Sequence, residues 1–128
     1  VALLILYSKM FMAQLVLAQP CVLPPPPEPC ADLCNVLSLA ERDNDAIKSY
    51  GAWKLAHQPF AYADIWESLG KIFSAVGFGR CLWGTDWTRA VELLDYEQGV
   101  ESFRVTDQLS DSELSELMGG SLAKIYNW

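Results

Sequence analysis

The sequence contains little positive charge and little imidazole. Nine lysine and arginine residues stand against 16 aspartate and glutamate residues, which gives a net charge of −7, and there is a single histidine. A surface with this balance cannot neutralise a phosphate backbone, so we expect no binding to nucleic acid. One histidine and four cysteines without a CxxC spacing argue against a zinc site built from this chain alone.

Several catalytic motifs are also missing. The sequence has no glycine-rich phosphate loop, no serine nucleophile elbow and no HExxH, which argues against the enzyme classes that depend on them. We interpret the cysteines as reduced, mostly buried thiols of a cytoplasmic protein, with disulfides as the alternative.

The 128 residues, 52% of them hydrophobic, are enough for one domain with a buried core. Residues 1–30 form an apolar and proline-rich segment without a firm assignment, and residues 31–128 form the body of the domain. The apolar stretch 1–18 contains Lys9, so we interpret it as a buried helix followed by a strand near 13–18. A signal peptide or membrane anchor is the alternative, although we expect no association with a membrane.

The hydrophobic pattern after residue 30 predicts alternating helices and strands. The spacing of apolar residues predicts helices at 31–42, 62–76 and 96–105. It predicts strands at 45–50, after the first helix, and at 80–84, after the second helix. Gly77 is expected to end the second helix. Ser110 and Glu113 form a capping box for a helix that ends at Gly119-Gly120, and Ser121 is expected to cap a last short helix. This alternation predicts parallel β/α units.

The apolar run at 80–84 leads directly into Thr85-Asp86. A buried strand of this kind would present one carboxylate at its C-terminal end, where parallel α/β barrels place their active sites. Asp86 could accept a proton from an attacking water or bind a metal ion. The structural alternative is that Asp86 caps a short helix over 87–90.

Other candidate site residues surround this acid in the expected fold. His57, on the loop after the 45–50 strand, could be a base, a substrate ligand or a surface residue. Lys48 and Arg89 could bind a substrate anion, or pair with carboxylates of the protein. Three tryptophans could line an aromatic pocket or pack in the core: Trp53, Trp83 and Trp87.

Three segments together resemble the C-terminal end of the amidohydrolase-related family, which includes 2-pyrone-4,6-dicarboxylate lactonase-like hydrolases and related decarboxylases. They are FGRCLWGTDW (78–87), LSDSELSELMGGSLAKIYNW (109–128) and AIKSYGAWKLAHQPFAYADIWESLGKIF (46–73). The resemblance implies a TIM (β/α)8 barrel that hydrolyses small, often carboxylated, ester, lactone or amide substrates. It also implies that Asp86 is the general base and, in members that use one, contacts a divalent metal such as zinc or manganese.

The sequence departs from this family in two respects. A complete barrel needs about 250 residues, so the chain would supply only the last three strands, without the histidines of the first strand. Ala18 and Gln19 also stand where the family usually has a histidine. We therefore expect the C-terminal part of a hydrolase that is inactive alone and that pairs with a missing N-terminal half or a second copy. The rival hypothesis is a non-catalytic α/β module with a structural or interaction role.

Overall fold

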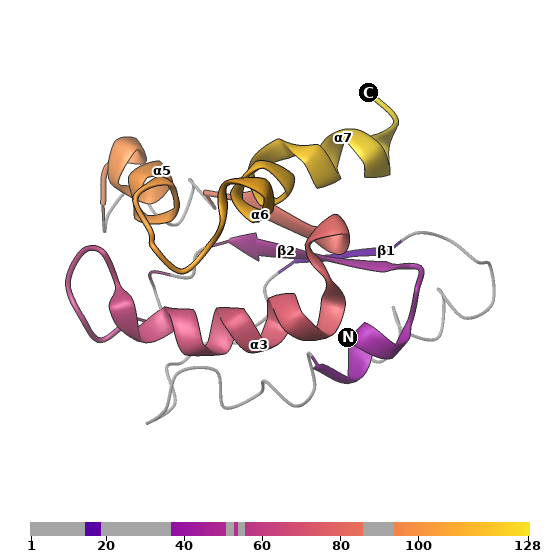
Figure 1. The fold of residues 1–128 in the computed structure, drawn as a ribbon, viewed down its shortest axis with the longest axis horizontal. Coiled ribbons are helices and arrows are strands. Elements are labelled where there is room, and N and C mark those ends of the chain that lie inside the picture. The colour runs from indigo at the N-terminus through magenta and orange to yellow at the C-terminus, as the bar shows by residue number, and fades with distance from the viewer. Residues whose placement is uncertain (1–14, 19–36, 51–52, 54–55, 86–93) are drawn as a thin grey trace.

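The computed structural model describes residues 15–18, 37–50, 53, 56–85 and 94–128. Within this part, three parallel strands form one sheet in sequence order (Figure 1): β1 (Leu15–Ala18), β2 (Asp45–Tyr50) and β3 (Cys81–Gly84). All three lie where the sequence predicts strands. The parallel register aligns Leu17 with Ile47 and Ile47 with Cys81, and this confirms the predicted parallel β/α arrangement.

Helix α3 (Trp66–Val76) connects β2 to β3 and confirms the second predicted helix. It is preceded by a 3-10 turn, η3 (Ala63–Ile65), and followed by another, η4 (Phe78–Arg80). Gly77 ends α3 with a φ of 82°, a conformation that glycine adopts without steric cost. None of the described helices is both long enough and apolar enough to cross a membrane.

The C-terminal segment is helical throughout most of its length. Helix α5 (Tyr96–Arg104) confirms the predicted helix at 96–105, and a capping box of Asp95 and Gln98 begins it. The predicted capping box is also confirmed: Ser110 Oγ accepts from the backbone N–H of Glu113, and the Glu113 carboxylate accepts from that of Ser110, at the start of α6 (Asp111–Ser115).

One expectation about helix ends is confirmed and another is wrong. The helix that begins with α6 continues through a π-type turn, η5 (Glu116–Gly120), and breaks at Gly119, which leaves the helical conformation before α7 (Ser121–Tyr126) begins. Ser121 does not cap α7, because its hydroxyl instead donates to the carbonyl of Phe78, 2.6 Å away. Of the helix predicted at 31–42, the structure describes residues 37–42: Leu37 is helical, Ser38–Glu41 form the 3-10 turn η1, and Arg42 is outside any helix.

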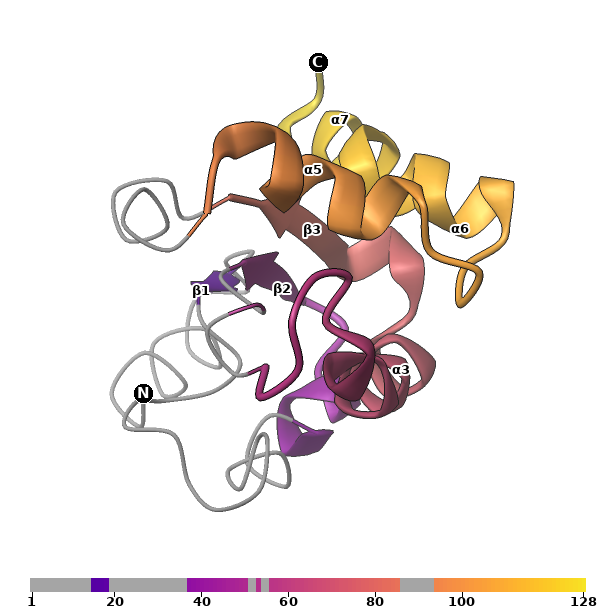
Figure 2. The ribbon, with the colours of Figure 1, turned by 90° about the vertical axis from the view of Figure 1, so that its left-hand side faces the viewer.

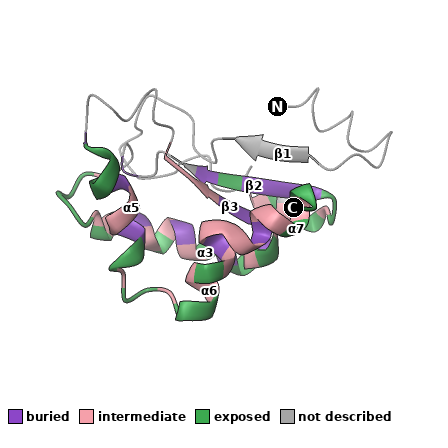
Figure 3. Ribbon diagram, turned by 90° about the horizontal axis from the view of Figure 1, so that it is seen from above, coloured by how far each residue is buried: buried purple, intermediate pink, exposed green. Residues whose placement is uncertain are grey.

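The helices pack against one face of the sheet (Figures 2 and 3). Ile47 of β2 and Cys81 of β3 belong to the same core cluster as Phe103 of α5 and Leu117 of η5. The buried stripe of α3 completes this cluster, with Leu69, Ile72, Phe73 and Val76. Because side chains alternate along a strand, Ala46, Lys48 and Leu82 belong to the opposite face.

Arg80 connects three segments at the end of the sheet where the strands begin. Its guanidinium donates to the carbonyls of Ala40 (3.1 Å), Arg42, Asp45 (3.3 Å) and Val76 (3.0 Å). Five donors in a planar fork allow arginine to satisfy several carbonyls at once. The side chain therefore holds η1, the start of β2 and the end of α3 together.

Replacing Arg80 by alanine is expected to lower the free energy of unfolding by about 2–3 kcal/mol, because several partly buried carbonyls lose a charged donor. The matched control is Arg104→Ala, which removes only an exposed pair with Glu101 at 2.6 Å and should cost less than about 0.5 kcal/mol. Urea unfolding of the two variants and the parent chain measures both values. Equal losses in the two variants would contradict the structural role of Arg80.

Candidate functional site

The C-terminal ends of β2 and β3 lie side by side, with Tyr50 aligned to Gly84. Strand β3 ends at Gly84, as the sequence predicts, and Thr85 follows it. The candidate acid, Asp86, is the next residue in the sequence. Asp86, Trp87 and Arg89 lie outside the described residues. Their roles therefore remain predictions, based on the position of Asp86 two residues after the end of β3.

Lys48 lies on the sheet face opposite the helix-packed core. In the register it is level with Ala18, the last residue of β1, and with Leu82 of β3. Ala46 and Leu82 on this face are buried, whereas Lys48 is exposed. In a barrel, the face that the helices do not cover is the interior, and its C-terminal end opens into the active site. This position is compatible with the predicted substrate contact of Lys48.

His57 lies on the loop that follows β2, with its side chain about half exposed. The backbone N–H of His57 donates to Asp64 Oδ2 at 2.6 Å, and its Nδ1 lies 3.6 Å from the same oxygen. Asp64 belongs to η3, so the pair connects the loop to the segment that leads into α3. Asp64 was not among the sequence candidates, because nothing in the local pattern indicates that the two residues meet.

Of the candidate tryptophans, Trp53 packs in the core and Trp83 packs against it. Trp53 is 5% exposed and belongs to the main cluster, and Trp83 packs against Phe103 with ring centroids 6.3 Å apart. Among the buried side-chain polar atoms without a hydrogen-bond partner in the described part of the chain are Ser49 Oγ, Trp53 Nε1 and Trp83 Nε1. They lie near the C-terminal end of β2 and β3, where a bound water or ligand could satisfy them.

The described residues do not provide a metal centre. In the described ranges, no group of three or more histidine, cysteine, aspartate or glutamate residues comes together. His57 and Asp64 make only a pair, and burial raises the pKa of the Cys81 thiol to about 12, which keeps it protonated at neutral pH. A metal ion at this edge of the sheet would need donors from outside the described residues.

The chain is similar in fold to solved amidohydrolase structures. No protein-family model matches the sequence, and a search of curated proteins finds no match. A zinc-bound crystal form of an amidohydrolase from Burkholderia multivorans matches 98% of this chain and 48% of its own, with a TM-score of 0.72 and 20% identity. A HEPES-bound form of an amidohydrolase from the same organism matches 74% of this chain and 36% of its own (TM-score 0.63, 22% identity).

A protein from Pseudomonas putida, provisionally assigned as a 2-pyrone-4,6-dicarboxylic acid hydrolase, gives a similar result. It matches over 73% of this chain and 35% of its own, with a TM-score of 0.61 and 21% identity. At these identities the likeness shows the fold alone. The chain spans less than half the length of each of these structures.

Proposed function

We propose that this chain is the C-terminal part of an amidohydrolase-type hydrolase that acts on a small carboxylated ester, lactone or amide. One observation carries this proposal. Three parallel strands in sequence order, with helices on one face, align over 98% of the chain with an amidohydrolase structure at a TM-score of 0.72. The sequence segments that resemble the family include most of β2 and α3 and all of β3.

In this proposal, Asp86 is the general base. Its carboxylate accepts a proton from water as the oxygen attacks the carbonyl carbon of the substrate. Lys48 and Arg89 bind the substrate carboxylate, while Trp87 and His57 contact the rest of the substrate. The exposed position of Lys48, level with the end of β1 on the face without helices, supports its part in this arrangement. Decarboxylation of a related acid is the alternative reaction.

The three strands would be the last three of a TIM (β/α)8 barrel. Three strands cannot close into a barrel, and among the described residues β1 and β3 are the two edges of the sheet, each with one side available to a further strand. The N-terminal half of the barrel, or a second copy of the chain, would pair with these edges. We infer that the 128 residues alone are inactive.

A bound zinc or manganese ion would polarise the carbonyl and lower the pKa of its water ligand. Asp86 would be one ligand, and in the described ranges no group of three or more histidine, cysteine, aspartate or glutamate residues comes together. The described residues therefore do not fit such an ion by themselves. The proposed proton transfer to Asp86 does not depend on it.

The test uses the product of the complete open reading frame that contains these residues, assayed against small carboxylated lactones, esters and amides. We expect hydrolysis of at least one substrate class by the complete product and none by the 128-residue chain. No hydrolysis by the complete product, with the protein folded, would favour the non-catalytic α/β module instead. Equal rates from both would contradict the inference that the chain is inactive alone.

A further inference from the structure

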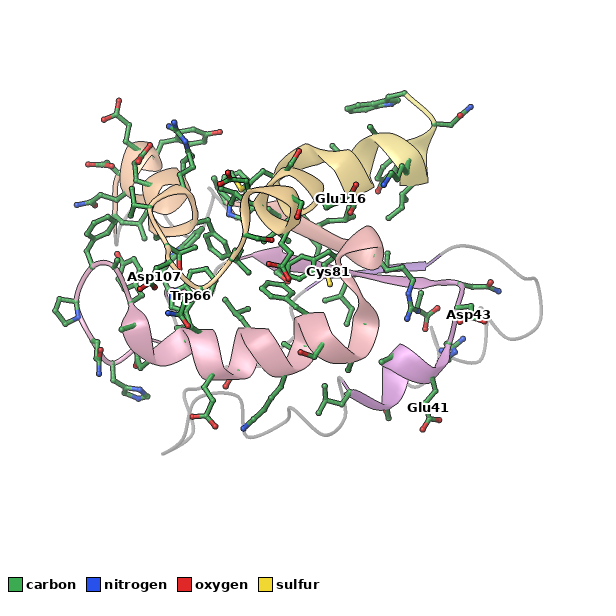
Figure 4. All side chains as sticks on the ribbon, in the orientation of Figure 1. Glu41, Asp43, Trp66, Cys81, Asp107 and Glu116 are labelled. Atoms are coloured by element: carbon green, nitrogen blue, oxygen red, sulfur yellow. The ribbon has the colours of Figure 1, made fainter. Side chains whose placement is uncertain are left out.

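We draw no further inference here: the strongest candidate, the open and largely apolar groove along α3 that is lined by Leu37, Trp66, Gly70, Ser74 and Ala75 (Trp66 is labelled in Figure 4), carries no proposal because nothing in the structure shows what covers it.

Discussion

Asp86→Asn, introduced into the product of the complete reading frame, is expected to lower kcat by about a thousand-fold. General base catalysis by a positioned side chain contributes on the order of 10²–10⁴ to a rate. Asparagine has nearly the same shape as aspartate but cannot take a proton from water. Initial rates at saturating substrate, with matched circular dichroism spectra, measure the effect without a confounding loss of fold.

The control for this variant is Asp43→Asn. Asp43 is an exposed acid in the turn before β2, at the opposite end of the strands from Gly84, which precedes Asp86 by two residues in the sequence. Its replacement removes the same charge from the chain, so its kcat should equal that of the parent. If the Asp86 and Asp43 variants are equally active, Asp86 is not the base.

Phe103→Ala is expected to reduce the free energy of unfolding by about 3–5 kcal/mol, as for other fully buried aromatic residues. The Phe103 ring is fully buried and contacts both Trp66 of α3 and Trp83 of β3. Its loss would leave a cavity where α5, α3 and the sheet meet. A loss of this size is a large part of the stability of an ordinary domain.

Urea unfolding followed by tryptophan fluorescence measures this loss, and Phe60→Ala is the matched control. Phe60 is 49% exposed and contacts only the edge of the Tyr62 ring among the described aromatic pairs. Its replacement should cost less than about 1 kcal/mol. A Phe103 variant no less stable than the Phe60 variant would show that α5 does not pack on the sheet as described.

The sequence predicts the elements of this fold well because their signals are local. The α3 stripe at Leu69, Ile72, Phe73 and Val76 is a helical repeat, and all four side chains are buried. The Ser110 and Glu113 capping box also needs only adjacent residues to form. Such features depend on periodicity and on hydrogen bonds within one turn, which can be seen in the sequence alone.

Long-range contacts could not be predicted in this way. Ser121 has the residue type and spacing of a helix cap, but its hydroxyl donates to a carbonyl 43 residues earlier in the chain. Arg80 donates to carbonyls 35 to 40 residues away, as well as to Val76 one turn before it. These partners depend on how the elements pack in three dimensions. A hydrogen bond to an acceptor far away in the sequence leaves no recognisable pattern in the neighbouring residues.

The candidate site was predictable only in part. The sequence predicts where β3 ends and which strand carries Lys48, because alternation and the Gly84-Thr85 step are local features. It does not predict the pairing of His57 with Asp64, because the two residues meet only through the path of the loop between β2 and α3. Asp86, Trp87 and Arg89 lie outside the described residues, so their roles stay predictions.

The most direct test of the central proposal is the position of the Asp86 carboxylate in a crystal structure of the complete reading-frame product. We predict that β3 pairs on its second edge with a strand from the preceding part of the protein. The Asp86 carboxylate should then point into the barrel interior that Lys48 also faces. An Asp86 side chain that points toward the helices, or a β3 whose second edge stays unpaired, would contradict the proposal.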